Sequence, residues 1–190
     1  MRRVLFFMMV SLDGYFEGEQ REIDWHNTDE EFNDFATAQL NEVDTLLFGR
    51  VTYELMAAYW PTESAIRDDP VVAEKMNGLE KIVFSKTLAN SEWQNTRLVK
   101  QHFAAEVMRL KQQTGKDLII FGSSGLAVSF LEHSLLDELR IMVNPVVLGR
   151  GKPIFRGIND RLSLKLVRVR PFLSGNVLLS YEPVRKRVPA

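Results

Sequence analysis

The chain alternates short, almost wholly apolar runs with segments of helical periodicity, and this alternation limits the possible folds more than any other feature. Apolar runs of this length are too short for most helices and are typical of strands buried on both faces. They lie at residues 2–10, 44–48, 81–85, 97–100 and 117–121. Helical segments lie at 29–42, 49–60, 71–77, 104–113 and 126–131, and residues 61–70 are expected to form a polar loop. Strands that alternate with helices require crossover connections, so we expect a mainly parallel sheet with helices on both faces.

The pattern changes after Asp137. Three segments there alternate or run apolar, at residues 138–149, 162–173 and 176–184, and a Ser-Gly-Asn turn separates the last two. This pattern predicts antiparallel strands that extend the sheet at one edge. The expected fold class is therefore an α/β three-layer sandwich with a mainly parallel central sheet and antiparallel C-terminal strands, in one domain over residues 1–190.

Composition excludes several classes of protein. The 190 residues include no cysteine, which excludes disulfide bonds and catalytic or metal-binding thiolates and fits a reducing, cytoplasmic location. With 24 basic and 25 acidic residues, the net charge of −1 gives no reason to expect a nucleic acid partner. The apolar run at residues 4–10 is much shorter than the roughly 20 residues of a membrane span, and no cleavage site follows it, so we expect no membrane partner. The basic end, residues 184–190, is expected to be a solvated terminus.

Small, hydroxyl and cationic residues follow three of the predicted parallel strands. In a parallel sheet, ligands bind outside the carboxyl ends of the strands. Glycine lets a ligand approach the backbone closely, and the start of a helix favours phosphate. A ligand with two separated phosphate groups would use all three strand ends. The residues are Gly49, Arg50 and Thr52 after one strand, Ser85 and Lys86 after the next, and Gly122, Ser123, Ser124 and Gly125 after the third.

Each strand end also has a plain structural interpretation when taken alone. The serines after Gly122 can cap a helix, Arg50 can pair with Glu54, and Ser85 with Lys86 can belong to an ordinary polar loop. Neither Gly-x-Gly-x-x-Gly nor Gly-x-x-x-x-Gly-Lys-Ser/Thr occurs, which argues against a standard Rossmann site and a P-loop. The three histidines lie far apart in the sequence and lack the spacing of metal ligands, so no metal site is expected.

Five short motifs occur in a fixed order over nearly the whole chain. They read SLDGYF, FGRVTYE, VFSKTL, IIFGSSGLA and NPVVLGRGKPIF. In this order the chain resembles the dihydrofolate reductase-like family, and specifically the branch similar to the C-terminal reductase domain of the bacterial riboflavin biosynthesis protein RibD. Two departures stand out: the family often has a Gly-Gly pair where this chain has Gly122-Ser123, and the first loop differs from that of dihydrofolate reductases proper.

The resemblance implies an NADPH-dependent reductase with a dihydrofolate reductase-like fold. Arg50 and Thr52, which follow Gly49, would meet phosphate groups of the cofactor. Residues 122–125 would cradle the pyrophosphate. Ser85 and Lys86 would hold the adenine ribose and its 2′-phosphate. Two cations near one phosphate site favour NADPH over NADH.

The substrate implied by the resemblance is a pterin- or pyrimidine-like small molecule, as for 5-amino-6-(5-phosphoribosylamino)uracil reductase. Asp13 and Gly14 would lie beside the nicotinamide. A nucleotide-binding module with the same fold and no turnover is the alternative, and a subunit with a purely assembling role is a third. The apolar antiparallel edge and the family both suggest a homodimer.

A carboxylate near the reacting atoms would assist the reduction by supplying a proton. The family places one on the first helix, and Asp34 falls near that position, with a solvated surface aspartate as the plain alternative. Asp13 and Asp29 are rival candidates. Three aromatic residues near loops, Tyr15, Trp25 and Trp60, could stack on a flat heterocycle or simply pack on their neighbours.

Overall fold

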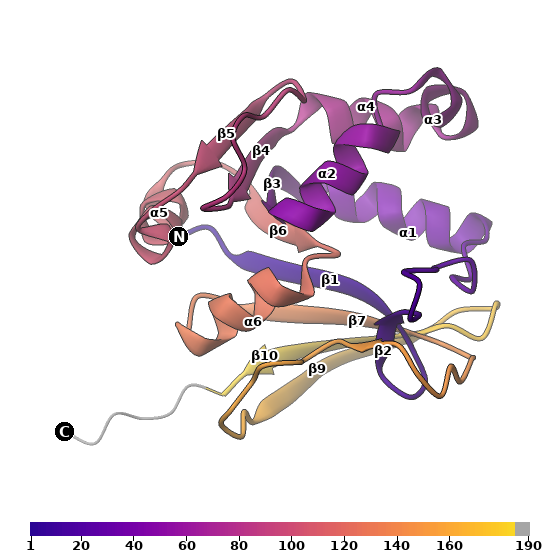
Figure 1. Cartoon of the computed structure of the whole chain (residues 1–190). Coiled ribbons are helices and arrows are strands. Elements are labelled where there is room, and N and C mark those ends of the chain that lie inside the picture. Colours follow the sequence, from indigo (N-terminus) through magenta and orange to yellow (C-terminus); the bar gives the residue numbers. More distant parts are fainter. Residues whose placement is uncertain (185–190) are drawn as a thin grey trace.

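The computed structural model describes residues 1–184, so the basic residues of the tail beyond Val184 lie outside the described part. Eight strands form one sheet in the order β5-β4-β3-β6-β1-β7-β10-β9 (Figure 1). These strands are β1 (Val4–Ser11), β3 (Val43–Gly49), β4 (Glu80–Phe84), β5 (Thr96–Val99), β6 (Asp117–Phe121), β7 (Glu138–Asn144), β9 (Leu164–Pro171) and β10 (Val177–Pro183). A separate two-stranded sheet pairs β2 (Tyr15–Glu17) with β8 (Lys152–Pro153).

The main sheet confirms the predicted fold class. β1 pairs in parallel with β6 and β7, and β3, β4, β5 and β6 are joined by parallel pairings. β10 is antiparallel to both β7 and β9. The segment at 138–149 therefore differs from the expectation of a wholly antiparallel ending, because its strand runs parallel to β1 on one side and antiparallel to β10 on the other.

Helices cover both faces of the sheet and create two apolar cores. Side chains of α5 and α6 pack with Phe6, Met8 and other residues on one face. Side chains of α1, α2 and α4 pack with Phe7, Met9 and their neighbours on the other. All eight residues of β1 are buried, which explains why its sequence is apolar without alternation. The helices are α1 (Glu30–Asn41), α2 (Arg50–Tyr59), α3 (Glu63–Asp68), α4 (Pro70–Gly78), α5 (Phe103–Gln112) and α6 (Ser124–Glu132).

The helix starts follow local capping chemistry, with two departures from the predictions. The capping-box spacing of Thr28 and Glu31 in the sequence predicts Thr28 as the cap of α1, but the cap is Asp29, whose carboxylate accepts a hydrogen bond from the Phe32 amide at 2.9 Å. The predicted polar loop at 61–70 contains the short helix α3, because the Thr62 hydroxyl accepts a hydrogen bond from the Ala65 amide at 3.2 Å. In residues 1–184 no helix is long and apolar enough to cross a membrane.

One charged side chain, Lys81 of β4, is fully buried. Its Nζ donates hydrogen bonds to the carbonyls of Met76, Asn77 and Leu79 at 2.9, 3.0 and 2.7 Å. The same atom lies 4.5 Å from the centre of the Trp93 ring. Burial lowers the pKa of Lys81 to about 8. The ammonium group thus satisfies carbonyls that the end of α4 leaves without partners.

Candidate functional site

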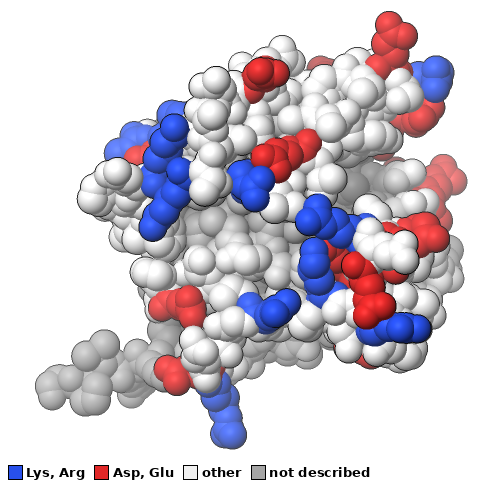
Figure 2. Space-filling model, in the orientation of Figure 1, with Lys and Arg blue, Asp and Glu red and all other residues white. Residues whose placement is uncertain are grey.

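The three strand ends singled out in the sequence lie side by side, because β4, β3 and β6 are neighbours and run parallel. Two hydrogen bonds connect the turn after β3 to the turn after β6. The Gly49 amide donates to the Ser123 hydroxyl at 3.0 Å, and the Thr52 hydroxyl donates to the Gly122 carbonyl at 3.2 Å. Figure 2 shows that the surface between α2 and α6 is hollowed at this place. The edge of the sheet therefore presents a cleft floor made of small residues.

The turn after β6 requires glycine at its first position. Gly122 has φ = +63°, and a Cβ there would lie 3.3 Å from the Thr52 methyl group. Gly125 has open space, since nothing lies within 4 Å of the place a Cβ would take. The first amides of α6 have no intrahelical acceptor. This arrangement fits the pyrophosphate cradle that the sequence predicts at residues 122–125.

The hydroxyl groups of both serines in that turn make hydrogen bonds within the protein. Ser123 is buried, and its hydroxyl accepts the hydrogen bond from Gly49. The Ser124 hydroxyl donates to the Ile154 carbonyl at 2.7 Å and so connects α6 to the segment before β9. At this site Ser124 can therefore offer a ligand its amide, while its side chain is already used.

The predicted cations Arg50 and Lys86 follow the ends of β3 and β4 and are both exposed. Arg50 is exposed and pairs with Glu54 at 3.1 Å, which is the plain interpretation that the sequence left open. Lys86 is exposed as well. The Ser85 hydroxyl accepts hydrogen bonds from the amides of Thr87 and Leu88 at 3.2 and 3.0 Å and so shapes the turn. Lys86 is thus accessible to a ligand in solvent. Arg50 would have to leave its ion pair with Glu54 in order to bind a phosphate.

Asp13 holds two loops together. Its carboxylate accepts hydrogen bonds from the amides of Leu148 and Gly149 at 3.1 and 2.7 Å. The Ser11 hydroxyl and these amides lower the pKa of Asp13 below its usual value. A carboxyl group that ionises more readily is a poorer proton donor at neutral pH. Gly14, with φ = +86°, turns the chain directly after it.

The other proton-donor candidates lie around the start of α1. Asp34 is exposed on the helix, and Asp29 is engaged as its cap. Glu31, which no sequence motif marks as a candidate, accepts a hydrogen bond from the Leu173 amide at 2.9 Å and pairs with Arg170 at 3.1 Å. These contacts attach the helix to the turn between β9 and β10.

Aromatic side chains connect α1 to the end of β6. The Phe7 ring lies 6.0 Å from that of Phe121 and 6.5 Å from that of Phe32, measured between ring centres. Phe121 directly precedes Gly122. Phe32 in the first turn of α1 is therefore connected to the residue before the predicted cofactor turn through the ring of Phe7. The aromatic candidates Tyr15, Trp25 and Trp60 are all partly buried, and Trp60 packs on Tyr59 with ring centres 5.0 Å apart.

An asparagine network supports the loop before α1, and an Asn-Pro pair at residues 144 and 145 is its one visible sign in the sequence. Asn144 is fully buried, and its amide group donates to the carbonyls of Val10 and Met142 at 3.2 and 3.4 Å. Its Oδ1 accepts a hydrogen bond from the Asn27 amide at 2.9 Å. His26 directly precedes Asn27, and burial lowers the pKa of its imidazole to about 4. The network fixes the loop that leads into α1 against the ends of β1 and β7.

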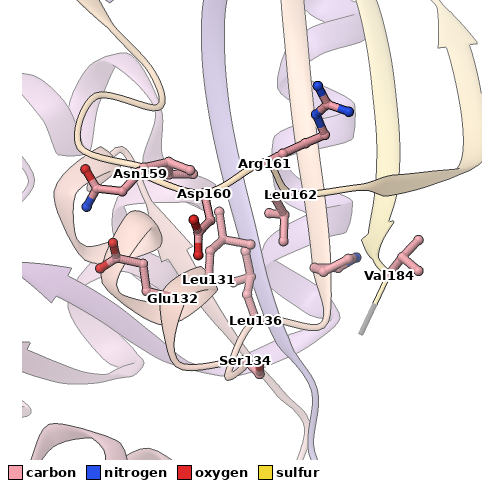
Figure 3. Close-up of a pocket in the computed structure, with 11 residues that line it drawn as sticks. Leu131, Glu132, Ser134, Leu136, Asn159, Asp160, Arg161, Leu162 and Val184 are labelled. Carbon is pink, nitrogen blue, oxygen red and sulfur yellow. The ribbon is translucent and has the colours of Figure 1, made fainter. Parts of the chain in front are cut away.

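A cavity of about 570 Å³ lies away from these strand ends (Figure 3). It is lined by the end of α6 and the residues after it, by residues 158–162 and by the end of β10. None of the predicted cofactor or catalytic residues lines it. Across residues 1–184, no three His, Asp or Glu side chains are grouped as a metal ion would require.

Comparison with known proteins identifies the family. The model of the RibD C-terminal domain matches residues 2–178. The chain belongs to the RibD C-terminal domain family. It is 36% identical over 183 residues to the uncharacterized protein YyaP of Bacillus subtilis (strain 168), a match covering 95% of this chain and 94% of that protein.

Solved structures show the same fold as this RibD C-terminal domain. A putative riboflavin biosynthesis protein from Shewanella sp. PV-4 has a TM-score of 0.75 and 23% identity, with 96% of this chain and 99% of that chain covered. The deaminase/reductase of Thermotoga maritima has a TM-score of 0.69 at 16% identity, with 96% and 57% covered. A dihydrofolate reductase from Enterococcus faecalis, complexed with NADP(H), has a TM-score of 0.65 at 16% identity, with 95% and 96% covered. The predicted resemblance is thereby confirmed.

Proposed function

We propose that the protein is an NADPH-dependent reductase of a pterin- or pyrimidine-like small molecule. The observation that carries this proposal is the joined pair of turns at the carboxyl ends of β3 and β6, with Gly122 in a left-handed conformation and Ser123 bound to the Gly49 amide. Support comes from the reductases of the same fold, one of which is described as complexed with NADP(H).

In this proposal the protein contributes binding and orientation, while NADPH supplies the hydride. The amides at residues 122–125 would hold the pyrophosphate, and Arg50 and Thr52 would meet a phosphate group from the other side of the cleft. Ser85 and Lys86 would take the adenine ribose with its 2′-phosphate. The residue that would donate the proton is a carboxylate at the start of α1, with Asp34 as the first candidate.

Calorimetric titration of the purified protein with NADPH and with NADH tests the cofactor. We expect tighter binding of NADPH, and a loss of roughly tenfold or more in Arg50→Ala and in Lys86→Ala, because each removes one charge contact to a phosphate. Arg67→Ala is the matched control, since Arg67 is an exposed arginine of α3 paired with Asp68. Equal affinity for both cofactors would contradict the 2′-phosphate assignment, and no binding of either would overturn the reductase.

The second candidate is a nucleotide-binding module without turnover. It is favoured by one observation: the carboxylate of Asp13 is engaged with backbone amides and has a lowered pKa. Turnover with a panel of pterins and aminopyrimidines separates the two candidates. NADPH oxidation that depends on one of these compounds, and that falls at least tenfold in Asp34→Asn, would support the enzyme with Asp34 as donor. Unchanged turnover in that variant would remove Asp34 from the mechanism and leave the reductase standing.

A further inference from the structure

The carboxyl edge of the sheet has a step between β6 and β1. The last pairing of these two strands joins Phe7 to Phe121, at the end of β6. Beyond that pairing β1 continues to Ser11, which pairs with Asn144, the last residue of β7. β1 and β7 therefore extend 11 − 7 = 4 residues past the end of β6, roughly 13 Å at about 3.3 Å per residue. A ligand bound at the turn after β6 would lie at the foot of this step.

Asn144, at the top of the step, attaches the loop before α1 to the sheet. Its side-chain amide donates to the carbonyls of Val10 and Met142, so the two strands of the step fix its orientation. Its Oδ1 accepts the hydrogen bond from the Asn27 amide at 2.9 Å. The loop is thus held by a side chain that is itself held by β1 and β7.

The turn between β9 and β10 holds the same loop, and Figure 1 shows this turn at the end of the sheet where α1 begins. The Asn27 side chain donates to the Ser174 carbonyl at 2.9 Å, and the Asn176 side chain donates to the Asn27 carbonyl at 2.8 Å. In the first turn of α1, Glu31 accepts a hydrogen bond from the Leu173 amide at 2.9 Å. The start of the helix is therefore fastened to β7 and to this turn together.

The residues that make these contacts with the loop are called the asparagine clamp: Asn27, Asn144 and residues 173–176. Three buried side-chain atoms in or next to the clamp have no hydrogen-bond partner within residues 1–184, namely Ser174 Oγ, Asn176 Oδ1 and His26 Nε2. Burying a polar group without a partner costs stability. The clamp is thus arranged for a fixed geometry rather than for the greatest stability, which is more common at functional sites than elsewhere.

The helix that the clamp holds contacts β1 at the foot of the step. The ring of Phe32, in the first turn of α1, lies 6.5 Å from that of Phe7, measured between ring centres. The Phe7 carbonyl accepts a hydrogen bond from the Gly122 amide at 3.3 Å. One residue of β1 is therefore in contact both with the clamped helix and with the first residue of the predicted cofactor turn.

We infer that Asn144 is a positioning residue for the reduction, because through the asparagine clamp it holds the first turn of α1 at the foot of the step. This inference rests on the proposed function, which takes its proton donor from the start of α1. Asn144 is fully buried, so it acts through the loop and not by contact with a substrate. Loss of the clamp should release the start of α1 and leave the turns after β3 and β6 in place, since their hydrogen bonds do not involve it.

Hydrogen exchange of Asn144→Ala tests whether the clamp holds the helix. We expect exchange at least roughly tenfold faster at the amides of Asn27, Phe32 and Asn33, because the loop that caps the helix loses its attachment to β7. Exchange at Gly122 should stay unchanged. Unchanged exchange at the start of α1 would overturn the inference.

Asn77→Ala is the matched control. Asn77 is also an asparagine with two side-chain contacts, since it accepts a hydrogen bond from Trp93 Nε1 at 2.7 Å and donates to the Trp60 carbonyl at 2.9 Å. It lies at the end of α4, directly before β4, and therefore at the opposite edge of the sheet. This variant should lose stability without faster exchange at the start of α1. An equal rise in exchange there in both variants would contradict a local clamp.

Kinetics separate positioning from a general loss of stability. NADPH oxidation is followed with 5-amino-6-(5-phosphoribosylamino)uracil, and the Kd of NADPH is measured by calorimetry. We expect kcat/KM to fall at least roughly tenfold in Asn144→Ala, because a misplacement of about 1 Å can cost on the order of 100-fold. The Kd of NADPH should stay within about twofold, and Asn77→Ala should change neither quantity. Equal losses of NADPH affinity and of turnover would overturn the inference.

A milder variant decides the question if Asn144→Ala does not fold. Asn27→Ala keeps the backbone contacts with Asn144 and Asn176 and removes only the side-chain hydrogen bond to Ser174. We expect the same changes at smaller size: faster exchange at Phe32, a several-fold lower kcat/KM and an unchanged Kd of NADPH. No change in exchange or in turnover would overturn the inference.

Failure of the proposed function would look different from failure of the clamp. If NADPH does not bind to the unchanged protein, the reductase itself is wrong, whatever the exchange shows. If NADPH binds and the compound is not reduced, hydrogen exchange of the NADPH-bound protein decides. Faster exchange at the start of α1 in Asn144→Ala with an unchanged Kd of NADPH would then support the clamp, and equal exchange in the two proteins would overturn it.

Discussion

At the scale of single residues, the buried ammonium of Lys81 makes a definite prediction about pH. Its folded-state pKa of about 8 is lower than the 10.5 of a free lysine, so the unfolded chain binds more protons between these two values. Stability due to this group should therefore rise as the pH increases from 8 to 10.5, by at most roughly 3 kcal/mol. Urea denaturation of the protein and of Lys81→Met across this range measures the difference.

The control for this prediction is Lys165→Met, which removes an exposed lysine of β9. We expect its stability to follow that of the unchanged protein at every pH. A difference between Lys81→Met and the unchanged protein that is constant from pH 8 to 10.5 would show that Lys81 does not titrate there.

Gly122 allows a second prediction at this scale. Alanine in its left-handed conformation costs about 1–2 kcal/mol, and the added methyl would press on the Thr52 side chain. Gly122→Ala should lower the midpoint of thermal unfolding by several degrees. Gly125→Ala is the matched control, because it adds a methyl to open space at the start of a helix and should leave the midpoint unchanged or higher. Equal midpoints for both variants would contradict the strained turn.

Residue types were easier to predict than their partners. The sequence pointed to the strand ends that meet in the cleft, because small and cationic residues after a buried strand are visible in it. It could not show that Ser124 is bonded to Ile154 or Asp13 to the amides of residues 148 and 149, since those partners arrive from far along the chain. The roles of these residues toward a cofactor or a proton stay predictions.

At the scale of elements, the hydrogen bonds of Asp13 should hold the loop after β1 against residues 148–149. Asp13→Ala removes the acceptor for two backbone amides. We expect faster hydrogen exchange at Leu148 and Gly149, with β1 itself unchanged, because those amides lose the carboxylate that accepts their hydrogen bonds while the sheet is untouched. Asp24→Ala, at an exposed position of the same segment, is the control. Unchanged exchange at residues 148 and 149 would mean that the carboxylate does not hold them.

The elements that were predicted well are those with a strong periodic or apolar signal. All five apolar runs before residue 122 became strands, and the long helices lie within a few residues of their predicted bounds. The helix α3 was missed because six residues carry too little periodicity to separate it from a loop. The direction of β7 could not be seen, since an apolar strand looks the same whether its neighbour runs with it or against it.

At the scale of the whole molecule, β9 is an edge strand that leaves apolar side chains in solvent. Leu166, Val167 and Val169 are each about half exposed. Exposed apolar edges are usually covered in natural proteins. We propose that a second copy of the chain covers this face, as the sequence suggested. Light scattering after size-exclusion chromatography should give the mass of a dimer, and Val169→Lys should shift it toward that of a monomer.

The control for the dimer is Val71→Lys, which places the same charge at a similarly exposed valine of α4. It should leave the mass unchanged. A monomeric mass for the unchanged protein at micromolar concentration would exclude the dimer, and dissociation by both variants would move the contact away from β9.

The order of strands in the sheet also has a consequence for synthesis on the ribosome. Among the described strands β1 comes earliest in the chain, yet its partners in the sheet are β6 and β7, the nearer of which begins about 110 residues later. At usual rates of translation that interval is on the order of ten seconds. Throughout it, the run Val-Leu-Phe-Phe-Met-Met-Val lacks its native strand partners, so the nascent chain exposes an apolar segment that the folded protein buries. Until β6 has been made, this apolar segment cannot form its native pairings and is prone to aggregation.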